Sequence, residues 1–110
     1  MGKITIEDFE NSHFKVEIEH QAADEDDDTL ACLTKGGCYF RLNFDPKGRY
    51  VEIYLNNENY IAGNVIYAEN VENFHDLLDK LADRFEEISL YYKNKQMLAK
   101  IVAYEIRKAK

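Results

Sequence analysis

The strongest hydrophobic pattern in this chain lies between residues 70 and 92. Large apolar residues recur there at alternating steps of three and four, a spacing that lines up one stripe on an α-helix. The stripe consists of Val71, Phe74, Leu78, Leu81, Phe85, Ile88 and Tyr92. The pattern predicts a helix over residues 70–91, capped at its start by Asn70 or Asn73.

A second helical pattern follows residues 93–96, which contain no hydrophobic side chain. Its apolar members are Leu98, Ile101, Val102 and Ile106. We therefore predict a second helix over residues 96–108, with one long kinked helix as the alternative.

Before residue 68, apolar and polar residues alternate in short runs, which is typical of strands with one buried face. In one such run Phe14, Val16 and Ile18 alternate with charged residues. Polar or glycine-containing turns separate the runs. The predicted strands cover residues 3–7, 13–19, 29–35, 38–44, 49–55 and 60–67.

The first glycine-rich turn predicts how two of these strands pair. Gly36-Gly37 is a two-residue hairpin signal, because both positions tolerate positive φ, and it would set Leu33 opposite Phe40. In that register Cys32 and Cys38 lie on opposite faces of the sheet. We therefore expect no disulfide between the two cysteines.

The second turn has the composition of a type I turn, Asp45-Pro46-Lys47-Gly48. A four-residue loop there would set Leu42 opposite Val51 on the apolar face. On the other face it would set Arg41 opposite Glu52, a favourable cross-strand pair.

A three-residue loop at 57–59 would then pair Val51 with Val65 and complete the meander. The fold class is thus α+β: an antiparallel β-meander of four to six strands, followed by two C-terminal helices packed on one sheet face, as one domain over residues 1–110. The sheet face under the main helix would consist of Phe40, Leu42, Val51 and Ile53. As an alternative, part of the helical stripe forms a dimer seam.

Composition and charge argue against some classes of function. The chain has 21 acidic and 14 basic residues and a net charge of −7, which opposes nucleic-acid binding, although residues 93–110 hold one acid and six bases. No apolar run is long enough for a membrane span and no signal-peptide core is present, so we expect a cytoplasmic protein with free thiols.

The sequence predicts neither catalysis nor a cofactor or metal site. The three histidines, His13, His20 and His75, have no zinc-ligand spacing with each other or with cysteine. The acidic run that starts at Asp24 lacks the Gly and Glu of a calcium loop, since Thr29 and Lys35 occupy those positions. A weak Mg²⁺ or Ca²⁺ site in this run is a minor alternative.

Three groups of residues are candidates for contact with a partner. The acidic loop and the polar side of the main helix could each dock on a basic surface, or could simply be solvated. The outer sheet face combines tyrosine with arginine, as many protein interfaces do. The candidates are Asp24, Asp26, Asp27 and Asp28 of the loop, Asp76, Asp79 and Asp83 of the helix, and Tyr39, Arg41, Tyr50 and Tyr54 of the sheet face.

These features predict a small acidic, non-enzymatic protein that binds another macromolecule, as a monomer or a homodimer. An inhibitor or adaptor of the mobile-element or phage type, docked on a partner protein with a basic surface, is the most specific form of this hypothesis. The alternative is a single-stranded nucleic-acid binder that uses the tyrosine face and the basic C-terminal tail.

Overall fold

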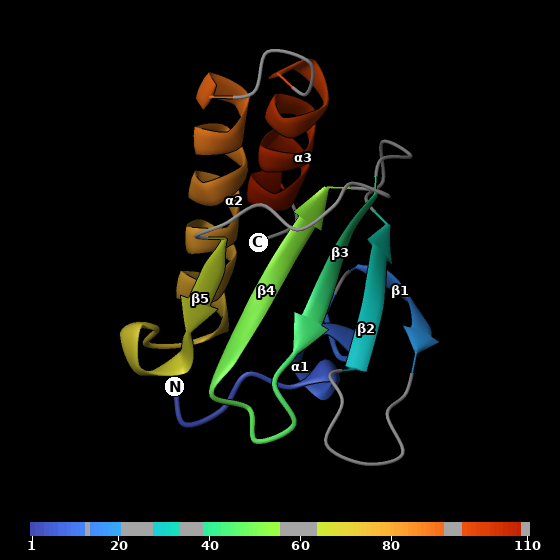
Figure 1. Cartoon of the computed structure of the whole chain (residues 1–110), viewed down its shortest axis with the longest axis vertical. Helices are drawn as coiled ribbons and strands as arrows, with labels where there is room; N and C mark the ends of the chain where they lie inside the picture. The colour runs from blue at the N-terminus through green and yellow to red at the C-terminus, as the bar shows by residue number, and fades with distance from the viewer. Residues whose placement is uncertain (13, 21–27, 34–38, 56–63, 92–95, 109–110) are drawn as a thin grey trace.

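The structure is a computed structural model that describes residues 1–12, 14–20, 28–33, 39–55, 64–91 and 96–108. Its strands form one antiparallel sheet in the order β1-β2-β3-β4-β5 (Figure 1). They are β1 (Lys15–His20), β2 (Asp28–Leu33), β3 (Tyr39–Phe44), β4 (Tyr50–Leu55) and β5 (Val65–Tyr67). The helices are α1 (Ile6–Glu10), the 3-10 turn η1 (Ala68–Asn70), α2 (Phe74–Tyr91) and α3 (Gln96–Lys108).

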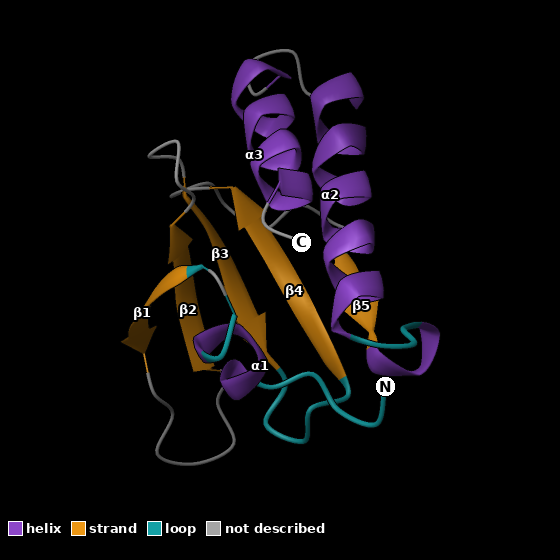
Figure 2. Ribbon diagram, turned by 180° about the vertical axis from the view of Figure 1, so that it is seen from behind, coloured by secondary structure: helices purple, strands orange, loops and turns teal. Residues whose placement is uncertain are grey.

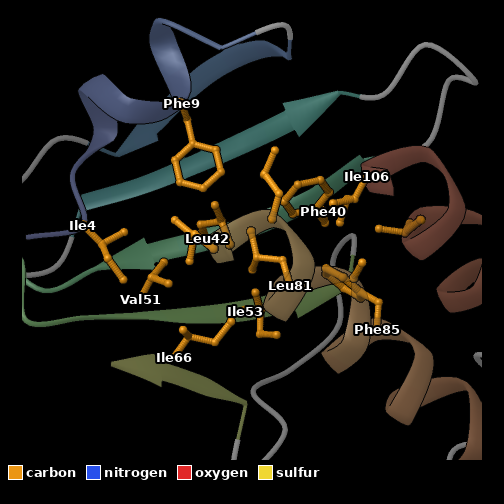
Figure 3. Close-up of a cluster of buried hydrophobic side chains, with 14 of the residues drawn as sticks. Ile4, Phe9, Phe40, Leu42, Val51, Ile53, Ile66, Leu81, Phe85 and Ile106 are labelled. Atoms are coloured by element: carbon orange, nitrogen blue, oxygen red, sulfur yellow. The ribbon is translucent and has the colours of Figure 1, made fainter. Parts of the chain in front are cut away.

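All three α-helices lie on the same side of the sheet (Figure 2), and the described elements leave the other side uncovered (Figure 1). Between the two layers lies one hydrophobic core, in which residues of β3 and β4 meet residues of α2 (Figure 3). The predicted α+β class, with an antiparallel meander and two C-terminal helices on one face, is confirmed. The sheet has one strand fewer than the six runs suggested.

The missing strand is the one predicted at residues 3–7. Ile6–Glu10 is helical instead, because Thr5 caps the helix and donates its backbone N–H to Oδ2 of Asp8 at 2.9 Å. The helix brings Phe9 into the core, where its ring meets Phe44 at 5.7 Å between centroids. The prediction rested on the alternation of Ile4 and Ile6, and two apolar residues are too few to distinguish a strand from one helical turn.

The predicted pairing of β2 with β3 is wrong by one residue. Leu30 lies opposite Leu42, and Cys32, rather than Leu33, lies opposite Phe40. β1 explains this register, because Val16 and Ile18 pair with Cys32 and Leu30 and so extend apolar rows across the sheet. Gly36-Gly37 and Cys38 lie outside the described residues, as does the predicted relation between the cysteines.

The turn at Asp45-Pro46-Lys47-Gly48 is confirmed, since the backbone N–H of Gly48 donates to the carbonyl of Asp45 at 2.9 Å. The strand register beyond it is shifted by two residues. Leu42 lies opposite Ile53, and Arg41 lies opposite Tyr54 rather than Glu52. An even shift leaves the faces of both strands unchanged, so the apolar face was predicted correctly even though its pairs were not.

Arg49 causes the longer loop. Its side chain bends back onto Asp45, with 2.7 Å from Nε to Oδ2 and 3.0 Å from Nη2 to Oδ1. The backbone N–H of Asp45 then donates to the carbonyl of Tyr50 and closes the loop at 3.1 Å. Arg49 is therefore part of the turn and not the first residue of β4.

The pairing of β4 with β5 also differs from the prediction by one residue. Val51 lies opposite Ile66, not Val65, and Ile66 is the buried residue of β5. The one-residue slip exchanges the two faces of β5, because side chains alternate along a strand. Residues 60–63 of the predicted strand lie outside the described residues.

The two C-terminal helices were predicted at nearly the observed bounds. α3 lies beside α2 in both views, which excludes one long helix (Figures 1 and 2). α2 begins at Phe74, and its cap is Asn73, whose Oδ1 accepts the backbone N–H of Asp76 at 2.9 Å. The described members of the stripe, from Val71 to Ile88, are buried within the chain except half-buried Phe74, so the stripe does not form a dimer seam.

Candidate interaction surfaces

One face of α3 exposes a row of large hydrophobic side chains, which we term the α3 stripe: Met97, Ile101 and Tyr104. Their spacing of four and three residues places them on one side of the helix. They are 74%, 37% and 60% exposed. Contiguous exposed apolar side chains on a small protein mark interaction sites more often than scattered ones do.

The opposite face of α3 holds the helix in the core. Ala99, Val102, Ala103 and Ile106 are all buried there, and two of them are too small to bury much surface. The predicted apolar set placed Ile101 with the buried residues, whereas it lies at the edge of the exposed face. α3 thus presents apolar side chains on two faces.

Sequence reasoning missed the α3 stripe because it followed a single apolar row, which contained Ile101 but neither Met97 nor Tyr104. A signal was nevertheless present. Met97 and Tyr104 are seven residues apart, and together with Ile101 they form a second helical row that is out of phase with Val102 and Ile106.

Basic side chains flank the α3 stripe. Lys108 places its Nζ 5.2 Å from the centroid of the Tyr104 ring, within the range of a cation–π contact. Lys100 is exposed one position before Ile101. The stripe therefore has an apolar centre with Lys100 and Lys108 beside it, and half-buried Glu105 lies one turn after Ile101.

Arg107 lies beside the stripe and connects α3 to α2. Its guanidinium donates to Oε1 of Glu86 and to Oδ1 of Asp83, both at 3.0 Å. The Arg107 hydrogen bond lowers the pKa of Glu86, and the same contact raises the pKa of Arg107. This network links the C-terminal part of α3 to α2 at the protein surface.

The predicted acidic stripe on α2 is largely engaged within the chain. Asp76 accepts Nζ of Lys80 at 2.9 Å, and Asp83 accepts Arg107. A hydrogen bond from the backbone N–H of Glu72, together with Lys80, lowers the pKa of Asp76. Asp79 is half-buried. These contacts offset part of the negative charge that a basic partner would meet.

The outer sheet face brings together most of the predicted tyrosine cluster. Arg41 lies opposite Tyr54, and Nδ2 of Asn43 reaches the Tyr54 hydroxyl at 3.4 Å. The ring of Tyr50 meets the ring of Tyr67 edge-on, with 6.0 Å between centroids. Tyr67 was not among the predicted residues, because its face depended on the register of β5.

For two further predicted residues the structure gives only their position in a strand. Asp28 is the first residue of β2, where its backbone pairs with Phe44, and Tyr39 is the first residue of β3. Asp24, Asp26 and Asp27 lie outside the described residues. The acidic loop therefore stays a prediction.

Among the described residues, no group of three or more His, Cys, Asp or Glu side chains is placed to hold a metal ion. In the same part of the chain, no helix combines the length and apolar character that crossing a membrane requires.

Comparison of the chain with protein-family models, with curated proteins and with solved structures finds no match. Function is therefore inferred from the residues and their arrangement.

Proposed function

We propose that this chain is a small non-enzymatic cytoplasmic protein that acts by binding another protein, and that the α3 stripe is the centre of the contact. The observation that supports this most strongly is the exposure of Met97 and Tyr104 on a helix whose opposite face is already anchored in the core. Aromatic residues and Met are enriched at the centres of protein interfaces.

The margin of the stripe suggests the chemistry of the partner. An apolar groove with acidic residues along its rim would receive the apolar row and meet Lys100 and Lys108. A helix laid in such a groove binds through side chains at positions i, i+4 and i+7, which here are Met97, Ile101 and Tyr104.

An inhibitor or adaptor role, with the loop from Asp24 to Asp28 docked on a basic surface, is the more specific form of this proposal. The net charge of −7 supports it. The ion pairs of Asp76 and Asp83 favour the loop over α2 as the acidic contact. A single partner with an apolar groove and a basic patch would bind the α3 stripe in the groove and the acidic loop on the patch.

The test compares two tyrosine variants of the tagged full-length chain, expressed in its native host. Tyr104→Ser should reduce the amount of the co-purifying partner, and its affinity for that purified partner, about tenfold or more, because it removes an aromatic anchor. Tyr67→Ser is the matched control, since it makes the same chemical change at a half-exposed tyrosine of the sheet. Equal binding by wild type and Tyr104→Ser would contradict the proposal.

A second candidate function is single-stranded nucleic-acid binding on the outer sheet face. The observation in its favour is that Tyr50, Tyr54 and Tyr67 lie on neighbouring strands, with Arg41 directly opposite Tyr54. Such a face can stack unpaired bases. The acidic composition opposes it.

The same two variants separate the candidates. In a titration with labelled single strands at low salt, a nucleic-acid binder would lose affinity in Tyr67→Ser and keep it in Tyr104→Ser. Absence of binding by the wild type at low ionic strength would exclude this second function, because phosphate contacts are strongest there.

A further inference from the structure

β5 is the terminal strand of the sheet, and its outer edge offers backbone groups for pairing. Two hydrogen bonds fix the direction of these groups: Ile53 N–H donates to the carbonyl of Asn64 at 3.0 Å, and Ala68 N–H donates to the carbonyl of Arg49 at 2.8 Å. Bonding directions alternate along an antiparallel strand, so the N–H and C=O of Val65 and Tyr67 point away from β4. Tyr67 is also the N-cap of η1, so its C=O accepts the first hydrogen bond of that turn, and the outward groups that remain for pairing on the described edge are the N–H and C=O of Val65 and the N–H of Tyr67.

A groove of about 650 Å³ runs along this open edge. One wall is β5 itself, and the other is a row of charged residues on α2: Lys80, Asp83, Arg84 and Glu87. An open strand edge is normally protected, because exposed backbone groups invite pairing with another chain. Here the edge lies beside a helix whose charges alternate in sign.

The order of these charges is self-complementary. Reading from Lys80 to Glu87 gives plus, minus, plus, minus, with Asp83 and Arg84 at the centre. If a second α2 runs antiparallel to the first about this centre, Lys80 faces Glu87 of the second copy, and Asp83 faces Arg84 of the second copy. Every charge in the row then meets its opposite, which is the property that an isologous two-fold interface requires.

The strand edge is compatible with the same two-fold axis. An axis beside Ile66 would set Val65 opposite Tyr67 of the second copy. The N–H of Tyr67 would then donate to the C=O of Val65, and the N–H of Val65 would share the C=O of Tyr67 with η1. The groove already places the middle of α2 alongside β5, so one axis can serve both elements. The two five-stranded sheets would become continuous across the axis.

We propose that this chain forms a homodimer in which the β5 edges pair antiparallel and the charged rows of α2 face one another. The interface is separate from the α3 stripe. The dimer proposal and the proposed protein-binding function can therefore be tested independently of each other. This dimer is not a coiled coil formed by the hydrophobic stripe of α2, because the residues of that stripe pack in the core of their own chain.

These charged side chains already have partners within the chain, so a second copy must be able to contact them in addition to those partners. Lys80 contacts Asp76 at 2.9 Å, whereas Arg84 and Glu87 are 3.4 Å apart, long for a charge-assisted hydrogen bond. The side chains of Lys80, Arg84 and Glu87 are 39%, 39% and 55% exposed. Asp83 accepts Arg107 at 3.0 Å, and its side chain is 65% exposed. All four side chains can therefore reach a second copy while keeping these contacts.

The test is a charge exchange read by mass in solution, using light scattering or sedimentation of the full chain. Wild type should be a dimer. Lys80→Glu should set like charges at positions 80 and 87 of the two copies, and Glu87→Lys should do the same with opposite sign. Each variant alone should dimerise at least about tenfold more weakly, and an equimolar mixture should recover the dimer.

Matched controls lie on β1, at the opposite edge of the sheet. Lys15→Glu and Glu17→Lys change the net charge by the same amounts at exposed positions and should leave the dimer intact. Circular dichroism checks that each variant is folded. As a second probe, Val65→Pro removes an N–H that points away from β4 and should weaken dimerisation without removing a hydrogen bond within the sheet.

Three results would overturn the proposal: a wild-type monomer at all concentrations, folded charge variants that dimerise as well as wild type, or a mixture that fails to recover the dimer. If the β5 edge pairs with an extended segment of another protein instead, the wild type alone would be a monomer.

Discussion

The ring of Phe40 on β3 meets the ring of Phe85 on α2 edge-on, with 5.4 Å between centroids and an interplanar angle of 63°. Both residues are fully buried. The contact joins the sheet to the helix that covers it, and Phe14 meets Phe40 from the side of β1 at 5.9 Å. One pair of residues, 45 positions apart in the chain, thus connects both layers of the fold.

Replacement of Phe85 by Ala should therefore destabilise the protein by about 3–5 kcal/mol, since it removes a buried ring and leaves a cavity between the layers. Urea unfolding monitored by circular dichroism measures the loss. Phe74→Ala is the matched control, because Phe74 is only half-buried. An equal or larger loss in Phe74→Ala would show that the Phe40–Phe85 contact is not central to the core.

Gly48→Ala should cost roughly 1–2 kcal/mol from the left-handed backbone alone. Gly48 has φ +73°, and a Cβ atom placed there would lie 2.7 Å from Cβ of Lys3. The clash would also disturb the bond from Ile4 N–H to the Gly48 carbonyl, which anchors the N-terminal segment. Gly2→Ala is the control, since a Cβ atom added at Gly2 would have no neighbour within 4 Å, and this variant should unfold at the wild-type urea concentration.

Asp45 should make stability depend on pH in the acid range. The Arg49 hydrogen bond lowers the pKa of this buried carboxyl from its ordinary value of 3.8. Because the pKa is lower in the folded chain than in the unfolded chain, ionised Asp45 stabilises the fold above pH 3.8, and this contribution disappears as the pH falls through the lowered native pKa.

Asp45→Asn should accordingly be about 1.5–3 kcal/mol less stable than wild type at neutral pH, the range for hydrogen bonds to charged groups. Urea unfolding at a series of pH values should show this difference shrinking below pH 3.8. A difference that stays constant down to strongly acidic pH would mean that the carboxylate charge is not what stabilises the turn.

Asn73→Ala should cost about 0.5–2 kcal/mol, because the backbone N–H of Asp76 would lose its side-chain acceptor. Asn70→Ala provides the comparison, since Asn70 lies in η1 and was the other predicted cap. Thermal unfolding distinguishes the two variants. If Asn70→Ala is the more damaging one, helical structure begins earlier in solution than Phe74.

The features that were predicted correctly depend on residues close together in the chain. The bounds of α3, the turn at Asp45-Pro46-Lys47-Gly48 and the stripe of α2 all follow from local geometry and local hydrogen bonds. Apart from the strand at residues 3–7, the features that were predicted wrongly are strand registers, which were inferred from turn composition. The register of β2 depends on distant residues, because apolar rows run across from β1. The register of β4 depends on the contact of Arg49 with Asp45, which the composition of the turn does not reveal.

The residues of the candidate surfaces also divide into those that the sequence predicted and those that depend on tertiary structure. The sequence identified Arg41, Tyr50 and Tyr54 as one face, because an even shift in register keeps residues on their face. It could not include Tyr67, since an odd shift brought that residue to the tyrosine face. It also could not decide which of the two apolar rows of α3 is covered, because only packing against α2 and the sheet shows this.

The sequence by itself determined the α+β class, the two C-terminal helices and the hydrophobic stripe of α2, because the periods of helix and strand are properties of the backbone. Only the tertiary structure shows that the edge of β5 lies beside the charged row of α2, and that Met97, Ile101 and Tyr104 stay exposed. The physical reason is that burial and strand pairing depend on contacts between residues far apart in the chain. The way in which one strand or helix packs determines which apolar surface is left exposed for the next element to bury.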